Sequence, residues 1–245
     1  MSTKDYFSGH SKLYATFRPT YPDGLYAFIF KHVKNFDLAW DCATGNGQVA
    51  QVLAKHFKQV EATDISQQQL DNAVQIENIH YSVQGAEKTG FPDHRFDLIT
   101  VGQAMHWFDL DKFYTEVNRV AKKDALLAVW GYALCSVNPN VDEHFNHFYN
   151  HVVGPYWDSA RRMVEEEYQN IPFPFDLIPT PKFSIIVEWT LEEFAGYLTT
   201  WSATQKFIKD KNYNPVPEVV KLIHPYWREK EKVMFPVFLK LGKIS

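Results

Sequence analysis

The chain has 245 residues, of which 45% are hydrophobic and 22% are charged, and its formal net charge at pH 7 is −4. This composition is ordinary for a globular protein, and the length suits one domain with an elaborated cap. No run of Lys or Arg exceeds two residues, which argues against a nucleic-acid partner. No apolar stretch approaches the ~18 residues that a membrane span needs, and the N-terminus lacks an apolar signal core. The two cysteines, Cys42 and Cys135, indicate buried thiols rather than a disulfide framework, so we expect a cytoplasmic protein.

Strand-like and helix-like segments alternate between about residue 22 and residue 132. Buried strands are expected at residues 38–43, 60–65, 79–83, 96–101 and 125–130. Apolar residues at helical spacing lie between these runs, and Ser66 with Gln69 forms a capping box at the start of one helix. Single helices between strands require right-handed crossovers and a parallel sheet that is covered on both faces. Residues 36–132 are therefore predicted to form the core of an open α/β sandwich.

The alternation stops after Tyr132. Residues 133–182 combine prolines, aromatic and charged residues with two helix-like stretches, and we interpret them as a cap inserted over the carboxyl edge of the sheet. Three more elements are expected in residues 183–245, namely a strand at 183–189, a helix at 191–201 and a last strand at 233–241. Pro236 indicates that this last strand is an edge or carries a bulge. With residues 1–35 as an N-terminal segment and first helix, the whole chain is predicted to be one domain.

Three polar signals follow consecutive predicted strands, where the carboxyl ends of parallel strands form a binding crevice. The first is the loop Asp41–Gly47, whose glycines allow a tight turn and a close approach of the backbone to a ligand. The second is Asp64, a carboxylate suited to accept hydrogen bonds from both hydroxyls of a ribose. The third is Gly85-Ala86-Glu87, where a nucleobase would lie. Together they predict a nucleoside-containing cofactor.

Two classes of cofactor fit the glycine loop. Residues Gly45–Ala50 satisfy the dinucleotide pattern G-x-G-x-x-A, and Asp64 lies close to the ~20 residues further on that this pattern expects. On those residues alone a nicotinamide enzyme and an S-adenosylmethionine enzyme are equally supported. Asp41 favours the second, because an acid just ahead of the turn would repel a pyrophosphate but suits a cationic sulfonium amino acid.

Short sequence motifs along nearly the whole chain are shared with a known family. They are Arg18-Pro19-Thr20-Tyr21-Pro22, the loop Asp41–Gly47, Ala104-Met105-His106-Trp107-Phe108-Asp109, Trp130-Gly131-Tyr132, Gly154-Pro155-Tyr156-Trp157, Thr200-Trp201-Ser202-Ala203 and Lys240-Leu241-Gly242-Lys243. The chain resembles the class I S-adenosylmethionine-dependent methyltransferases and, among them, the trans-aconitate methyltransferase group. One departure is Ala43, which stands where such families usually have the first glycine and should narrow the loop slightly.

The resemblance implies a fold and a set of cofactor contacts. The fold would be a Rossmann-like three-layer α/β sandwich with a helical cap and a seven-stranded sheet, parallel except for an antiparallel strand near its C-terminal edge. Asp41, Ala43 and Gly45 would line the methionine moiety of S-adenosyl-L-methionine. The remaining contacts would be Asp64 and Ile65 at the ribose, Ala86 and Glu87 at the adenine, Gln103 and Ala104 beneath the sulfonium, and Tyr14 and Arg18, from an N-terminal lid, at the carboxylate.

The acceptor is expected to be a small molecule with a carboxylate, bound by a monomer or homodimer. Arg161 would bind that carboxylate, although Arg161 and Arg162 equally suit a solvated helix face opposite Glu165 and Glu166. His106 would be a general base or, for an acceptor that is already ionised, an orienting group. Pocket walls are expected from Tyr132, Trp157, Tyr197 and Trp201. A catalytically silent cofactor-binding protein remains an alternative.

A further pattern is the spacing of His144, His147 and His151, which places three imidazoles on one helical face. Phenylalanines are interleaved with them, and the acids or tight ligand shell of a metal site are missing. We expect no metal.

Overall fold

The computed structural model describes residues 17–245, so Tyr14 lies outside the described part of the chain. Its strands are β1 Leu38–Cys42, β2 Gln59–Asp64, β3 Ile79–Val83, β4 Phe96–Gly102, β5 Ala121–Tyr132, β6 Asp176–Ile178, β7 Phe183–Trp189 and β8 Glu231–Lys243. Its helices are α2 Asp23–His32, α3 Gln48–Leu53, α4 Gln67–Asp71, α5 Leu110–Val120, α6 Pro139–His147, α7 Arg161–Glu165, α8 Leu191–Thr199, α9 Ser202–Lys211 and α10 Val216–Ile223. Shorter helical turns are η2 Met105–Trp107, η3 Phe148–Val152, η4 Gly154–Tyr156 and η5 His224–Tyr226.

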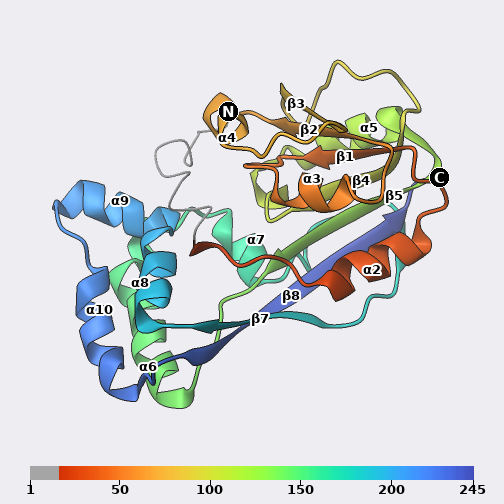
Figure 1. Cartoon of the computed structure of the whole chain (residues 1–245). Helices are drawn as coiled ribbons and strands as arrows, with labels where there is room; N and C mark the ends of the chain where they lie inside the picture. Colours follow the sequence, from red (N-terminus) through yellow and green to blue (C-terminus); the bar gives the residue numbers. More distant parts are fainter. Residues whose placement is uncertain (1–16) are drawn as a thin grey trace.

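The strands form one sheet in the order β3-β2-β1-β4-β5-β8-β6 (Figure 1). The pairs among β1 to β5 are all parallel, as the alternation of strands and helices predicts. Every residue of β1 is buried, because this strand is covered on both faces. The order in which strands are added to the sheet reverses between β1 and β4. The binding crevice of an open sheet lies at such a point, beyond the carboxyl ends of the two strands.

The C-terminal strand β8 runs antiparallel to β5, which confirms the expected reversal near this edge of the sheet. On its other side β8 pairs first with β7 and then with β6, so two short strands share the last position. β8 has a partner on both sides and so is no edge strand, but the bulge expected at Pro236 is present, because the pairing shifts by one residue between Tyr132–Val237 and Ser136–Met234. Pro236 lies just beyond the last β5–β8 pair, Tyr132–Val237, and its carbonyl accepts a hydrogen bond from the Ala133 N–H at 2.9 Å. A proline is tolerated at such a break in the regular pairing.

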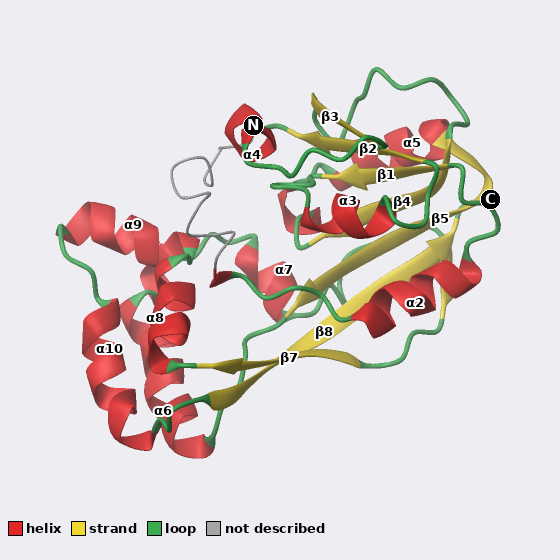
Figure 2. Ribbon diagram, in the orientation of Figure 1, coloured by secondary structure: helices red, strands yellow, loops and turns green. Residues whose placement is uncertain are grey.

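Helices cover both faces of the sheet, which gives three layers (Figure 2). Successive residues of β1 point to opposite sides, so that Ala39 packs with Leu25 of α2 and Leu53 of α3 on one face. On the other face Trp40 packs with Phe113 of α5. The three-layer sandwich predicted from the sequence is confirmed.

A helical lobe stands at one end of the sheet, formed by α6, α8, α9 and α10 (Figure 1). Helix α6 comes from the segment that follows β5, whereas the other three lie between β7 and β8. The lobe lies at the carboxyl end of β5. Helices α8 to α10 connect the end of β7 at Trp189 to the start of β8 at Glu231, and these two residues are paired. Its interior is aromatic, with the rings of Phe145 and Phe194 5.4 Å apart. Within residues 17–245, no helix combines the length and apolar character needed to cross a membrane.

Candidate functional site

The loop after β1 turns through left-handed backbone conformations. Gly45 and Gly47 have φ values of 56° and 80°, and a Cβ at Gly45 would meet no atom within 4 Å, so this part of the loop is open. Ala43 has φ 55° and so adopts the same conformation with a side chain, which costs about 1–2 kcal/mol. The loop is tied to the sheet by the Thr44 N–H, which donates to the Thr63 carbonyl at 2.9 Å.

Asp41 is a buried carboxylate at the end of β1, with only 1% of its surface exposed. The hydroxyls of Thr44 and Thr100 donate to its two oxygens, the second at 2.8 Å. Burial raises the pKa of Asp41 to about 6 despite these two hydrogen bonds, and the negative charge of Asp64 adds to the increase. A cation bound beside Asp41 would therefore be favoured, because it would offset the cost of a buried negative charge.

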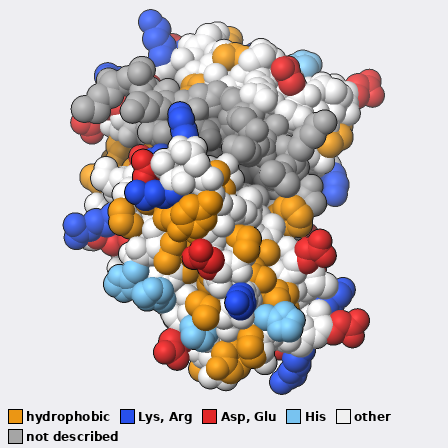
Figure 3. All heavy atoms as spheres, turned by 90° about the vertical axis from the view of Figure 1, so that its left-hand side faces the viewer, with side chains coloured by type: hydrophobic (Ala, Val, Ile, Leu, Met, Phe, Trp, Pro, Cys, Tyr) orange, Lys and Arg blue, Asp and Glu red, His pale blue; other side chains and the backbone are white. Residues whose placement is uncertain are grey.

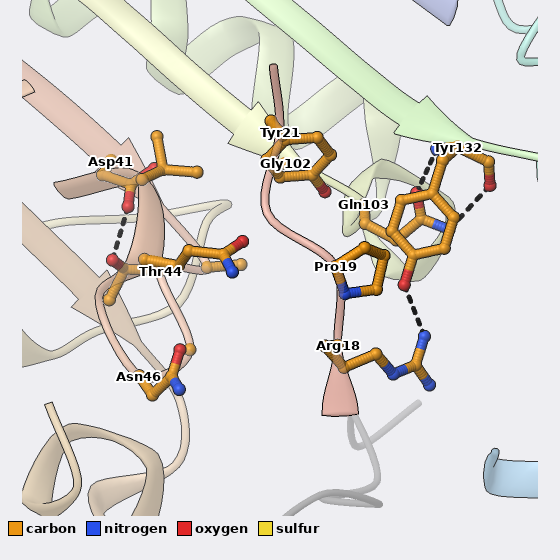
Figure 4. A pocket seen from close by; sticks show the side chains of 13 residues that line it. Arg18, Pro19, Tyr21, Asp41, Thr44, Asn46, Gly102, Gln103 and Tyr132 are labelled. Atoms are coloured by element: carbon orange, nitrogen blue, oxygen red, sulfur yellow. Dashed lines mark hydrogen bonds between the residues drawn. The ribbon is translucent and has the colours of Figure 1, made fainter. Parts of the chain in front are cut away.

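A pocket opens between this loop and the segment before α2 (Figure 4). We call it the glycine-loop pocket, and it is lined by Arg18, Pro19, Tyr21, Asp41, Ala43, Thr44, Gly45, Asn46, Gln48, Val49, Gly102, Gln103 and Tyr132. Arg18 donates to the Tyr132 hydroxyl at 2.6 Å, and the Gln103 amide bonds both backbone groups of Tyr132. The structure thus brings Arg18, Asp41, Ala43, Gly45 and Gln103 together, and it adds Tyr132, which the sequence places at the acceptor.

Asp64 lies beside this pocket and holds the loop from outside. Its Oδ2 accepts the Gly45 N–H and its Oδ1 accepts the Ser66 N–H, both at 2.9 Å. The predicted cap at Ser66 is present, because its Oγ accepts the Gln69 N–H at 3.4 Å. Ile65, the next residue, is 45% exposed.

Three other predicted cofactor residues do not line the glycine-loop pocket. Ala86 and Ala104 are buried in the core on the α5 side of the sheet. Glu87 is part-buried and accepts the Asp109 N–H at 3.1 Å. These contacts place Glu87 at the start of α5, beyond the end of β3.

A second pocket, which we call the aromatic pocket, adjoins the first. It is lined by Arg18, Gln103, His106, Trp107, Trp157, Asp158, Arg161, Tyr197, Trp201 and Ser202. Arg18 and Gln103 line both pockets, so the two share a wall. The rings of Trp157 and Trp201 are 5.4 Å apart. The pocket therefore collects all the predicted acceptor residues except Tyr132, together with Asp158, which no sequence pattern singles out.

The two neighbouring arginines of α7 have different environments. Arg162 is exposed and pairs with Glu166 at 2.7 Å, as a solvated helix face predicts. Arg161 faces the aromatic pocket, where its Nε donates to the Tyr149 hydroxyl at 3.2 Å and its guanidinium lies 5.0 Å from the Trp157 ring centre. No salt bridge to Arg161 is found among residues 17–245. The solvated helix face predicted for the pair therefore describes Arg162, whereas Arg161 lies at the pocket.

His106 is part-buried in η2, and its Nδ1 lies 2.8 Å from the Tyr168 hydroxyl. Burial, with a smaller contribution from the positive charge of Arg161, lowers the pKa of His106 to about 3. The imidazole is therefore neutral throughout the physiological range. Other charged groups that line the same pocket are Arg18 and Asp158, and Asp158 is paired with Lys206 at 2.6 Å.

The histidines of α6 and η3 lie on a different surface. His144, His147 and His151 line an open hollow on the helical lobe together with Glu143, Asn146 and Asn150. Figure 3 shows histidine side chains among hydrophobic ones on this side of the molecule. Among residues 17–245, no group of three or more His, Cys, Asp or Glu side chains is arranged to hold a metal ion.

The chemistry of the glycine-loop pocket fits the cofactor that the resemblance implies. Asp41 offers a buried carboxylate for the cationic methionine portion, whereas Arg18 offers a guanidinium for its carboxylate. The open space at Gly45 admits a ligand against the backbone. A pyrophosphate, by contrast, would meet the Asp41 carboxylate at the base of the pocket.

Comparison with known proteins gives the same result. Residues 40–129 match the family model described as a methyltransferase domain. A methyltransferase of Dictyostelium discoideum is 35% identical over 98% of this chain and 95% of its own length. A methyltransferase of Aspergillus candidus is 26% identical over 71% of this chain and 64% of its own length.

Among solved structures, a type II methyltransferase from Anaeromyxobacter dehalogenans is 34% identical, with a TM-score of 0.86. The match covers 93% of this chain and 98% of that one. Likeness of this extent sets aside the nicotinamide alternative. The chain belongs to the class I S-adenosylmethionine-dependent methyltransferases.

Proposed function

We propose that the enzyme methylates a carboxylate oxygen of a small organic acid. The observation that carries this proposal is Arg161, a guanidinium without a carboxylate partner among residues 17–245 that faces a pocket adjoining the cofactor side. The Nε of Arg161 donates to the Tyr149 hydroxyl, and its guanidinium lies over the Trp157 ring. The two terminal nitrogens of an arginine suit a carboxylate. Aromatic walls from Trp157, Tyr197 and Trp201 would enclose the carbon skeleton.

Cofactor binding is assigned to the glycine-loop pocket and its border. Asp41, Ala43 and Gly45 would contact the methionine portion, Arg18 its carboxylate and Gln103 the sulfonium side. Asp64 and Ile65 would contact the ribose, and Ala86, Glu87 and Ala104 would complete the adenine side. S-Adenosylmethionine supplies a methyl group on a positively charged sulfur, so a carboxylate acceptor gains the methyl while the sulfur keeps the electron pair and no proton moves.

A neutral His106 is consistent with such an acceptor. A group with a pKa near 3 is a poor general base for an alcohol, phenol or amine at neutral pH. A carboxylate is already ionised and needs no base. Catalysis would then depend mainly on holding the acceptor oxygen in line with the methyl group.

A screen for methyl transfer to small di- and tricarboxylic acids tests the proposal. Labelled S-adenosylmethionine should give a labelled ester that alkali cleaves to labelled methanol. Methylation confined to amines, phenols or thiols would refute the carboxylate assignment. Cofactor binding without transfer to any of these classes would instead identify a silent cofactor-binding protein.

The rate of carboxylate methylation should be independent of pH between about pH 6 and 9, because no group that titrates there has to lose a proton. Initial rates at saturating cofactor and acceptor across this range measure it. A rate that climbs steeply through neutrality would show that a proton is removed and would contradict the carboxylate assignment.

Affinity for S-adenosylmethionine should fall as the pH drops below about 6, because Asp41 loses its charge there. Because the pKa of Asp41 is raised, this carboxyl is fully ionised only above that pH, and a bound cation favours the ionised form. Each pH unit below it should weaken binding by up to about tenfold. Calorimetric titrations between about pH 5 and 8 measure the effect.

S-Adenosylhomocysteine, whose sulfur is uncharged, provides the control and should depend less on pH. Asp41→Asn should bind S-adenosylmethionine more weakly and without this pH dependence. Equal pH profiles for the two ligands would show that Asp41 does not sense the sulfonium.

A further inference from the structure

Tyr168 is a buried side chain that contacts the site from behind. Only 1% of its surface is exposed, and it packs edge to face on Phe238 at 5.0 Å. It follows α7 in an unusual turn, because Glu167 and Tyr168 both have left-handed backbone conformations, with φ values of 52° and 57°. Consecutive non-glycine residues in this region are costly, so the turn persists only because the surrounding packing enforces it. No spacing in the sequence links Tyr168 to His106.

The surroundings of the Tyr168 hydroxyl determine the direction of its hydrogen bond to His106. The hydroxyl is buried, and the His106 Nδ1 is the hydrogen-bond partner found for it among residues 17–245. Burial raises the pKa of Tyr168, so the phenol keeps its proton. If the His106 Nδ1 carried a proton, the buried hydroxyl proton would have no acceptor, so the hydroxyl donates to the Nδ1, 2.8 Å away.

A histidine whose Nδ1 accepts a hydrogen bond carries its proton on Nε2. We propose that Tyr168 is a positioning residue that fixes His106 as the Nε2–H tautomer, so that His106 donates a hydrogen bond to the acceptor and cannot remove a proton from it. This inference rests on the proposed carboxylate acceptor. It adds that the enzyme selects acceptors that arrive already ionised.

The selection follows from the single proton of the neutral ring. To act as a base through Nε2, His106 would need its proton on Nδ1, where it would face the Tyr168 hydroxyl proton. That hydroxyl would then have to turn its own proton away from His106, and no other acceptor for it is found among residues 17–245. The hydroxyl of an alcohol or phenol would therefore face the Nε2–H of His106, a hydrogen-bond donor, where its methylation needs a group that takes up a proton.

The tautomer is measured directly by ¹⁵N NMR of histidine-labelled enzyme with S-adenosylhomocysteine and no acceptor. The chain has 10 histidines, and the signals of His106 are those that disappear in His106→Gln. We expect an unprotonated Nδ1 and a protonated Nε2 in the wild type, and a mixture of the two tautomers in Tyr168→Phe. Protonated Nδ1 in the wild type would overturn the proposal.

Tyr114→Phe is the matched control. Tyr114 is another buried tyrosine on the same face of the sheet, and its hydroxyl donates to the Pro172 carbonyl rather than to His106. Its removal should leave the His106 tautomer unchanged. If both variants disturb the tautomer equally, the effect is one of packing and the proposal fails.

Kinetics test the consequence for the acceptor. Tyr168→Phe should raise the KM of the acceptor about three- to tenfold, which is the worth of one neutral hydrogen bond, with kcat changed less. His106→Gln places an amide N–H near the position of Nε2, so Tyr168→Phe should have no further effect on KM in that background. An undiminished effect there would show a purely structural role. The NMR result needs no acceptor, so this inference can fail separately from the carboxylate assignment.

Discussion

Replacing Arg161 with Gln is expected to raise the KM of the carboxylate acceptor by about tenfold to a hundredfold, with a smaller change in kcat. The side chain keeps a hydrogen-bonding amide but loses the charge and the paired donors. A hydrogen bond to a charged group is worth about 1.5–3 kcal/mol, which sets the size of the effect. Steady-state kinetics with the acceptor identified by the screen measure it.

Arg162→Gln is the control, since it removes the same charge from the same short helix. Arg162 is exposed and paired with Glu166, so its loss should leave KM within a factor of about two. The pair of variants separates a local contact from a general loss of positive charge. Similar KM values for both variants would remove Arg161 from the acceptor site.

Replacing Asp64 with Ala is expected to weaken S-adenosylmethionine binding by about tenfold to several hundredfold. The proposed ribose contacts would be lost. The substitution also removes the acceptor of the Gly45 and Ser66 N–H groups, which hold the glycine loop against the sheet. The dissociation constant from calorimetry is the relevant measurement.

Asp71→Ala provides the comparison, because it removes a carboxylate from α4, the helix that follows Asp64. Asp71 is exposed and accepts a hydrogen bond from the Gln67 amide at 2.8 Å, so cofactor binding should be unaffected. An unchanged dissociation constant in Asp64→Ala would remove Asp64 from the site.

Most of the sheet could be predicted from the sequence, because the signals for it are local. The five parallel strands coincide with apolar runs, and the structure shifts their ends by only a few residues. The antiparallel position of β8 required the family resemblance, because no local pattern states which neighbour a late strand will choose. Pro236, by contrast, correctly indicated a bulge, because proline within a sheet is confined to edges and irregular positions.

The glycine-loop pocket was also largely predictable, because Asp41, Ala43 and Gly45 lie in one short loop. The aromatic pocket was harder. Which of Arg161 and Arg162 faces it depends on the rotation of a short helix, which the charges around the pair do not define. Tyr149 and Tyr168 act through contacts between segments far apart in the chain, and no spacing reveals such contacts.

The two pockets share a wall, but they differ in how much of their lining comes from the stretch that matches the methyltransferase family model. The stretch that matches the methyltransferase model, residues 40–129, includes the glycine loop, Asp64 and His106. The groups that would recognise the acceptor come largely from outside it, namely Trp157, Asp158, Arg161, Tyr197, Trp201 and Ser202. Relatives can therefore inherit the methyl-donor half unchanged while their acceptor halves diverge. Exchanging the helical lobe together with η4 and α7 between two such enzymes should transfer the substrate preference and leave the affinity for the donor unchanged.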